Sequence, residues 1–243
     1  MNKRAIILAG GLGTRLKPYT HALPKPLMPV GDCPILEIVI RQLACAGFNR
    51  ITLAVNHQAD IIKAYCQDGS KWGVEIDYSL ETKRLGTMGP LHLIDDLPDN
   101  FLVMNGDILT DVDYETLFDD HMRSNASFTI SSSLREAKID YGVLEVDDEN
   151  SLCGFSEKPS QHFQVSMGIY VLSRSICDLI PNDTYFGFDD LMLAMLKAGL
   201  KVAVRPFTGY WLDIGRPDDY EAALEIFNDN RSIFLPENSG ASI

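Results

Sequence analysis

An apolar run that ends in three closely spaced glycines constrains this chain more than any other feature. Residues 5–9 read Ala-Ile-Ile-Leu-Ala, which is the pattern of a strand buried on both faces of a parallel sheet. Gly10, Gly11 and Gly13 follow at once, and glycine permits a positive φ and lets a ligand approach the bare backbone. Backbone amides freed in such a turn form a concavity that binds anions. The stretch therefore predicts a parallel α/β sheet with an anion-binding loop after its first strand.

Two familiar glycine loops do not fit this stretch. The dinucleotide-binding fingerprint requires a further glycine three positions after Gly13, where the sequence has Leu16. The P-loop requires Gly-Lys followed by Ser or Thr, whereas this chain has Gly-Thr-Arg. A dinucleotide-dependent oxidoreductase is thus the fold-level alternative that the sequence disfavours. Arg15 and Lys25 add fixed positive charge to the loop, which suits a polyphosphate.

The complete stretch is more informative than its glycines alone. From Gly10 to Thr20 it reads Gly-Gly-x-Gly-Thr-Arg-Leu-x-Pro-x-Thr, and Pro24-Lys25-Pro26 follows. This string resembles the signature of the sugar-1-phosphate nucleotidyltransferases. The resemblance extends from Ala5 to Tyr220, with the motifs in the family's order, and its mannose-1-phosphate guanylyltransferase-like branch is the most similar. It implies a Rossmann-like nucleotidyltransferase fold.

The resemblance also implies roles for the residues of the loop. In the family, the glycine loop holds a nucleoside triphosphate, and an arginine and a lysine neutralise its phosphates. Arg15 and Lys25 are therefore the predicted catalytic residues. The predicted nucleotide-binding residues of the loop are Leu8, Ala9, Gly10, Gly11, Gly13 and Thr14.

The remainder of the chain alternates between strand and helix patterns through residue 125. Predicted strands cover 51–55, 74–78, 101–104, 127–134, 143–146, 165–172 and 202–207, and predicted helices cover 34–44, 60–67, 87–97, 185–198 and 217–228. This order predicts a mixed, mostly parallel sheet flanked by helices. We expect a single nucleotidyltransferase domain over residues 1–229 and a loosely held tail over residues 230–243.

Two aspartates are candidate metal ligands. Asp107 follows a buried strand, and ligands of open α/β sheets bind outside the carboxyl ends of strands. Asp213 lies among apolar residues in Trp-Leu-Asp-Ile-Gly, and a buried carboxylate needs a partner such as a cation. The alternatives are a turn aspartate for Asp107 and a helix cap for Asp213. The resemblance implies that both hold Mg²⁺, which accepts a few protein oxygens together with water and phosphate.

A second set of residues is predicted to bind the sugar phosphate. The resemblance implies that Glu157 accepts hydrogen bonds from sugar hydroxyls, that Lys158 binds the sugar's phosphate, and that Gly142 lets the backbone approach the sugar. An exposed charged turn before a proline is the alternative. The full predicted set is Asn105, Gly142, Glu157, Lys158, Ser166 and Asp190.

Two members of this set carry an open question. The family commonly has asparagine in an Asn-x-Gly-x-Tyr motif, where this chain has Ser166. Serine keeps a hydroxyl but lacks the reach of the amide, which leaves the identity of the sugar open. Asp190 is either an acid near the sugar or a helix cap.

The predicted base subsite contains Glu81, Gly86 and Thr87. Glu81 precedes Leu85-Gly86-Thr87-x-Gly, which resembles the guanylyl-transferring branch of the family. Guanine presents two N–H donors to a carboxylate, whereas cytosine, thymine and uracil offer fewer. GTP is therefore the favoured nucleotide, and UTP, dTTP and CTP remain alternatives.

Composition limits the partners and the location. The formal net charge is −13, which disfavours binding to nucleic acids and to anionic membranes. The five cysteines include no Cys-x-x-Cys pair, which is typical of reduced thiols. There is no signal-peptide pattern and no apolar stretch of membrane-spanning length. We expect a cytoplasmic protein with small anionic substrates, and a homo-oligomer remains open.

These patterns predict a Mg²⁺-dependent enzyme that joins a nucleoside triphosphate to a sugar 1-phosphate. The products are a nucleoside-diphosphate sugar and pyrophosphate. A catalytically silent subunit that senses nucleotide or sugar phosphate is the alternative from another functional class. Such a sensor does not need to keep Arg15, Lys25, Asp107 and Asp213, all of which are present.

Overall fold

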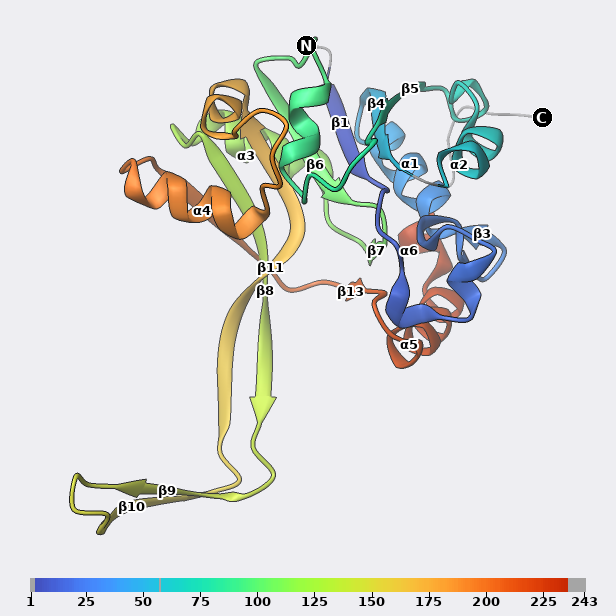
Figure 1. Ribbon diagram of the computed structural model, residues 1–243. Coiled ribbons are helices and arrows are strands. Elements are labelled where there is room, and N and C mark those ends of the chain that lie inside the picture. The colour runs from blue at the N-terminus through green and yellow to red at the C-terminus, as the bar shows by residue number, and fades with distance from the viewer. Residues whose placement is uncertain (1–2, 57, 236–243) are drawn as a thin grey trace.

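A seven-stranded sheet forms the centre of the computed structural model, which describes residues 3–56 and 58–235. The order of the strands is β12-β8-β11-β6-β1-β4-β5 (Figure 1). These strands are β1 (Lys3–Leu8), β4 (Phe48–Val55), β5 (Glu75–Leu80), β6 (Asn100–Asn105), β8 (Phe128–Lys138), β11 (Ser160–Ser173) and β12 (Val202–Phe207). Within the sheet β11 runs antiparallel to both of its neighbours, and the other pairs are parallel. The predicted mixed, mostly parallel sheet is confirmed.

Three helices cover one face of the sheet. They are α1 (Ile35–Cys45), α2 (Ala59–Cys66) and α3 (Tyr114–Arg123). Their apolar residues pack against Ala5 and Ile7 of β1, which point to one side of the strand because side chains alternate along it. Ile6 between them is buried on the other side, and this two-sided burial explains the continuous apolar run at the start of the chain.

The opposite face is covered by α4 (Phe188–Lys197) and by 3₁₀ turns. The helix predicted over 87–97 is wrong, because only a 3₁₀ turn forms there, over Gly89–Leu93. The amides of Met88 and Gly89 both donate to the carbonyl of Phe186 (3.0 and 3.1 Å). These hydrogen bonds tie the segment to a distant part of the chain.

A third apolar cluster closes the end of the molecule that carries the glycine loop. Here α5 (Pro217–Asp229) and α6 (Arg231–Phe234) pack against Leu16 and the start of α1. Phe234 and Leu235 are buried, so the first residues of the predicted loose tail instead belong to the core. Positions 236–243 of that tail lie outside the described residues. No helix within the described ranges is long and apolar enough to cross a membrane.

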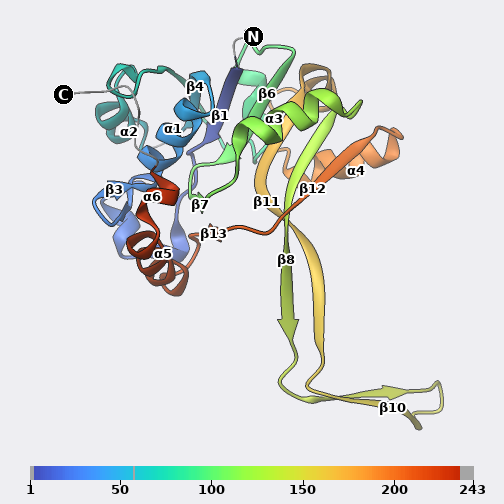
Figure 2. The ribbon, with the colours of Figure 1, turned by 180° about the vertical axis from the view of Figure 1, so that it is seen from behind.

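Three short strand pairs accompany the main sheet. They are β2 (Pro29–Val30) with β3 (Cys33–Pro34), β7 (Ile108–Thr110) with β13 (Trp211–Asp213), and β9 (Gly142–Val146) with β10 (Leu152–Glu157). The pair β7 and β13 joins the residues after β6 to the segment before α5. The pair β9 and β10 lies at the far end of a two-stranded ribbon formed by β8 and β11, as the two opposite views show (Figures 1 and 2).

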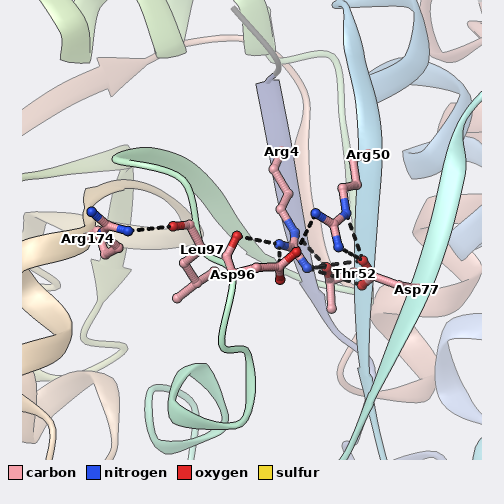
Figure 3. Close-up of polar contacts among 7 residues, drawn as sticks. All are labelled: Arg4, Arg50, Thr52, Asp77, Asp96, Leu97 and Arg174. Atoms are coloured by element: carbon pink, nitrogen blue, oxygen red, sulfur yellow. Dashed lines mark hydrogen bonds and ion pairs between the residues drawn. The ribbon is translucent and has the colours of Figure 1, made fainter.

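A buried arginine ties the strands together at the end of the sheet where β1 begins. Arg4 donates to the hydroxyl of Thr52 from Nε and Nη2 (2.9 and 2.7 Å) and to the carboxylate of Asp96 from Nη1 (2.7 Å) (Figure 3). Arg4 also pairs with Asp77, and Arg50 pairs with both aspartates. The bonds from Arg4 and Arg50 lower the pKa of Asp96 to about 2. This cluster fixes β1, β4 and β5 relative to one another.

Candidate functional site

A pocket of about 550 Å³ lies at the carboxyl ends of β1, β4 and β6. This is the edge at which open α/β sheets bind their ligands. Many of the predicted site residues line it, namely Leu8, Gly10, Gly11, Gly13, Thr14, Arg15, Lys25, Glu81, Gly86, Thr87, Asn105 and Asp107. Ala9 is buried behind the loop, where its amide donates to the carbonyl of Ala54 (2.8 Å).

Gly13 gives the glycine loop its turn, and Gly11 leaves it open to a ligand. Gly13 has a φ of +58°, and a Cβ at this position would lie 2.7 Å from Cγ2 of Thr20. The Thr20 hydroxyl donates to the Gly13 carbonyl (2.7 Å) and holds the turn closed. At Gly11, by contrast, a Cβ would meet no atom within 4 Å, because this residue faces open space. A ligand can therefore approach the backbone at Gly11.

Arg15 reaches the pocket beside Gly215. A Cβ on Gly215 would lie 3.0 Å from Nη2 of Arg15, so the absence of a side chain at position 215 makes room for the guanidinium. Gly215 follows the Asp213 segment and also lines the pocket. The contact brings the positive charge of the glycine loop to the predicted metal ligands.

Lys25 joins the two candidate metal ligands. Its ammonium is largely buried and forms an ion pair with Asp107, and it lies 3.8 Å from Oδ1 of Asp213. The two aspartates are neighbours because Asp213 pairs with Ile108 in the β7–β13 ladder. Burial raises the pKa of Asp213, and the Asp107 carboxylate adds to this effect, whereas Lys25 and Arg15 oppose it. The pair is thus a site of concentrated negative charge.

The donor set at this position fits Mg²⁺. The two carboxylates lie close enough to share one cation, which is Lys25 here. Within the described residues no group of three or more histidine, cysteine, aspartate or glutamate side chains is arranged to hold a metal. Two protein carboxylates are sufficient for Mg²⁺ where water and substrate phosphates supply the other oxygens.

The predicted base subsite packs against residues 185–187, a segment that the sequence patterns did not connect with it. The Leu85 amide donates to Oε1 of Glu81 (2.5 Å), and the other carboxylate oxygen of Glu81 faces Gly10. Gly86 has a φ of +82°, and a Cβ there would lie 2.5 Å from the Phe186 carbonyl oxygen. The adjacent Tyr185 is exposed and lines the pocket. The base loop and residues 185–187 therefore form one wall.

The lining residues that were absent from the sequence-based set include three with polar side chains, namely Asn56, Arg84 and Tyr185. A sequence signal existed for Asn56, because it directly follows the buried strand β4, and Asn105 was predicted from its place at the end of the buried strand β6. The Asn56 amide donates to the carbonyl of Gly10 and so supports the glycine loop. Arg84 and Tyr185 gave no such signal, since each lies in a loop whose path depends on tertiary contacts.

Two predicted sugar-phosphate residues lie near the pocket without lining it. The Ser166 hydroxyl lies 3.1 Å from that of Tyr170, at an irregularity of β11 where Gly168 approaches Asn105. The Asp190 carboxylate accepts a hydrogen bond from the Gly187 amide (2.8 Å) at the start of α4. Asp190 thus forms the helix cap that the sequence left open as its alternative.

The structure does not bring Gly142, Glu157 and Lys158 to the pocket of their own chain. Gly142 begins β9 and Glu157 ends β10, and this strand pair lies far from the helices and from β1 in both views (Figures 1 and 2). Lys158 follows in a turn with a φ of +45°. Their role in binding the sugar phosphate therefore stays a prediction, because this conformation places them away from the pocket of their own chain. The physical reason is the straight ribbon of β8 and β11 that carries them away.

Comparison with known proteins identifies the family of this chain. A family model described as nucleotidyl transferase matches residues 4–230. A UTP–glucose-1-phosphate uridylyltransferase of Synechocystis sp. is 33% identical over 91% of this chain and 62% of its own length. A mannose-1-phosphate guanyltransferase of Yarrowia lipolytica is 34% identical over 96% of this chain and 66% of its own length. The chain thus spans slightly less than two thirds of each of these relatives.

Solved structures share the fold. The crystal structure of HddC from Yersinia pseudotuberculosis is similar with a TM-score of 0.72 and 28% identity, over 93% of this chain and 99% of that one. HddC has also been crystallised in complex with GMP-PN, and that structure matches with a TM-score of 0.69. The similarity to HddC covers nearly the whole of both chains.

Proposed function

Since this chain belongs to the nucleotidyl transferase family, we propose that it transfers a nucleoside monophosphate from a nucleoside triphosphate to a sugar 1-phosphate. One observation carries the proposal. A glycine loop, the cations Arg15 and Lys25 and the carboxylate of Asp107 line a single pocket at the carboxyl edge of the sheet, and Asp213 lies beside it, 3.8 Å from Lys25. An oxyanion-rich substrate that also needs a divalent cation matches this set better than a neutral ligand does.

The proposed reaction is an in-line substitution at phosphorus. An oxygen of the sugar phosphate attacks the α-phosphorus, the bond from that phosphorus to the bridging oxygen of the β-phosphate breaks, and pyrophosphate leaves. The attacking phosphate is already ionised at neutral pH, so no general base is required. The protein therefore acts by positioning the substrates and by neutralising charge.

The glycine loop, the two cations and the two aspartates each have a role in this scheme. The backbone at Gly11 and Gly13 would hold the phosphates, and Arg15 and Lys25 would neutralise charge on the triphosphate and on the departing pyrophosphate. Asp107 and Asp213 would hold Mg²⁺, which when bound stabilises negative charge on phosphate oxygens.

GTP is the proposed nucleotide. Oε2 of Glu81 faces the pocket beside Gly10, where a carboxylate oxygen can accept from the N–H groups of guanine. Several relatives are named mannose-1-phosphate guanyltransferases, and HddC was crystallised with GMP-PN. Because another relative is named a UTP–glucose-1-phosphate uridylyltransferase, UTP is the second candidate nucleotide.

The proposed acceptor is the 1-phosphate of a hexose or a heptose. Lys158 would bind its phosphate and Glu157 its hydroxyls, with Gly142, Ser166, Asn105 and Asp190 as the other candidate residues. Replacement of Lys158 by alanine is expected to raise the KM for the sugar phosphate far more than the KM for the nucleotide. Equal effects on both constants would remove Lys158 from the sugar subsite.

Pyrophosphate release tests the proposal directly. The protein is incubated with Mg²⁺ and each of four nucleoside triphosphates against mannose, glucose and heptose 1-phosphates. Release with GTP alone supports the guanine assignment, and release with another nucleotide keeps the reaction but discards the role of Glu81. If folded protein binds a nucleotide but releases no pyrophosphate with any pair, the silent sensor is the better description.

A further inference from the structure

The ribbon of β8 and β11 leaves the body of the protein as a long arm. The edge strand β12 supports β8 only from Phe128 to Ser133, whereas the pairing of β8 with β11 continues to Lys138 and Ser160. The unsupported ladder is about 16 Å long at ~3.3 Å per residue. We define the arm as residues 134–165, and both views show it projecting away from the helices (Figures 1 and 2).

The arm exposes an unusual amount of apolar surface. Tyr141 is 79% exposed, and Leu144 and Phe155 are 61% and 59% exposed. The other large exposed apolar side chains of the arm are Leu134, Ile139, Val146, Leu152 and Phe163. A two-stranded ribbon without a packing partner is only marginally stable in water, and many large apolar side chains exposed on one segment are typical of an interaction site. The arm therefore has the composition of a segment that packs against another surface.

One part of the arm also carries polar and charged side chains. The elbow, which we define as residues 139–142 and 157–160, joins the ladder to the β9–β10 hairpin. The Ile139 amide donates to the Pro159 carbonyl (3.1 Å) and holds the two halves of the elbow together. The elbow thus presents an aromatic ring, a carboxylate and an ammonium at one place, from Tyr141, Glu157 and Lys158. This set suits a phosphorylated polyol, but the elbow by itself is not a cavity.

None of the described cations that line the pocket comes from the arm. The cationic residues that line the pocket are Arg15, Lys25 and Arg84, all from the loops that follow β1 and β5. Among the described residues that line it, none comes from the arm. Under the proposed function these cations face the triphosphate, so the second phosphate substrate still needs a cation.

The root of the arm directs the elbow away from its own pocket. At the root β8 is held between β12 and β11, and the guanidinium of Arg135 lies 4.8 Å from the centre of the Trp211 ring. The Trp211 indole in turn donates to the Met167 carbonyl of β11 (3.0 Å). β8 and β6 both run antiparallel to β11, so the arm leaves from the same edge of the sheet that carries the pocket. The elbow therefore extends past the body of the protein on the side where the sheet carries the pocket.

We infer that the elbow enters the pocket of a second copy of this chain, so that Glu157 and Lys158 complete the sugar-phosphate subsite across a dimer interface. Two chains related by a two-fold axis exchange arms reciprocally, because a two-fold interface uses the same surfaces on both subunits. Each arm then buries its apolar side chains on the partner, and each pocket gains a cation and a carboxylate. The identity of the ligand in this inference rests on the proposed function, whereas the contact between the arm of one chain and the pocket of the other does not.

Heterodimers of two inactive variants test the exchange. Chains with Lys158→Ala and chains with Asp107→Asn are co-expressed with different tags, and dimers that carry both tags are purified. In an exchanged dimer, one site combines the intact pocket of the first chain with the intact arm of the second. We expect about half of the wild-type pyrophosphate release per dimer at sugar phosphate below its KM. Background release would show that each arm serves its own pocket and would overturn the inference.

A second heterodimer inverts this expectation and controls for partial activity. It pairs a wild-type chain with a chain that carries both Lys158→Ala and Asp107→Asn. Exchanged arms leave one defect in each site, so release falls to background. Arms that fold back on their own chains leave the wild-type subunit intact, and about half of the activity then remains.

A measurement without catalysis separates this inference from the proposed function. Light scattering is expected to give about twice the chain mass of 27.0 kDa. A photo-crosslinker placed at Tyr141 is expected to join ¹⁵N-labelled chains to unlabelled chains at the peptides of the pocket loops. A monomer, or crosslinks confined to chains of one isotope, overturns the exchange. If the wild type releases no pyrophosphate, the proposed function fails, while mass and crosslinks still decide the exchange.

Discussion

The Lys25 ammonium lies 3.8 Å from the Asp213 carboxylate while it forms an ion pair with Asp107. One cation therefore bridges two carboxylates, one in the turn before β7 and the other at the end of the neighbouring strand β13. Without this bridge, two adjacent negative charges in a partly buried site would repel each other. A divalent cation held by both carboxylates would replace this bridge, and the ammonium would then be free to pair with a phosphate oxygen. The arrangement explains how a lysine and two aspartates can serve one reaction.

Replacement of either aspartate by asparagine is expected to lower kcat by on the order of 10²-fold or more, because a charge that holds the catalytic cation is lost. Asp107→Asn and Asp213→Asn are assayed for pyrophosphate release at saturating Mg²⁺. Thermal unfolding checks that both variants fold.

Asp229→Asn is the matched control for this pair. Asp229 is exposed near the end of α5, and this variant is expected to keep the wild-type rate. Rates like those of the wild type in Asp107→Asn or Asp213→Asn would remove the proposed metal site.

Two glycines of the pocket are expected to respond differently to replacement by alanine. Gly86→Ala places a methyl group against the Phe186 carbonyl at a φ of +82°, so a stability loss of about 1–3 kcal/mol is expected. Gly11→Ala meets no atom of the protein, so stability should stay unchanged while the KM for the nucleotide rises. Urea unfolding and nucleotide titration measure both effects. A destabilised Gly11→Ala variant would contradict the open approach to the backbone.

A buried histidine is expected to make the stability depend on pH near neutrality. His121 contacts Thr129 and Asn100 at its two ring nitrogens (2.8 and 3.2 Å), and burial lowers the pKa of His121. The unfolded chain then binds the proton more readily than the folded chain. The free energy of unfolding should therefore fall as the pH drops through about 6.5, the ordinary histidine pKa.

Urea unfolding at several pH values between about 7.5 and 5.5 measures this slope, which His121→Gln is expected to flatten. Asp96 titrates near 2 and so does not contribute to this window. A slope that is equal in the wild type and in the variant would assign the effect to other groups.

The Arg4 cluster is expected to contribute to stability without contributing to catalysis. Arg4→Met removes the hydrogen bonds to Thr52 and Asp96 and leaves the buried hydroxyl without these donors. A loss of about 1–3 kcal/mol in the free energy of unfolding is expected. Arg50 keeps pairing with Asp77 and Asp96, which limits the loss. The cluster lies at the opposite end of β1 from the pocket, so kcat below the unfolding transition should be unchanged.

The parts of the site that follow from local sequence were predictable, and those that depend on tertiary pairing were not. The strand before Gly10 and the turn at Gly13 follow from the residues themselves. Asp107 could be placed because the end of a buried strand fixes its position. The helix predicted at 87–97 is a 3₁₀ turn, and the hydrogen bonds of its Met88 and Gly89 amides to the distant Phe186 carbonyl are not encoded in the local pattern.

The arm shows more clearly that tertiary placement does not follow from the local sequence. Alternating residues predicted a strand over 143–146, and β9 confirms it. Its place in space depends on where β12 stops pairing with β8, at Ser133. No pattern within residues 134–165 contains this information, so the motif of Glu157 and Lys158 could be recognised but not located.

The choice of base is expected to depend on Glu81. Its Oε1 accepts the Leu85 amide (2.5 Å), and glutamine can keep this bond through its carbonyl oxygen. Glu81→Gln therefore preserves the loop but presents an NH₂ donor where guanine needs an acceptor. The ratio of kcat/KM for GTP to that for UTP should fall by about tenfold or more, since a buried donor then faces a donor. Kinetics with both nucleotides measure the ratio, with Glu75→Gln on β5 as an exposed control. An unchanged ratio would show that the base is recognised elsewhere in the pocket, with Arg84 and Tyr185 as the next residues to replace.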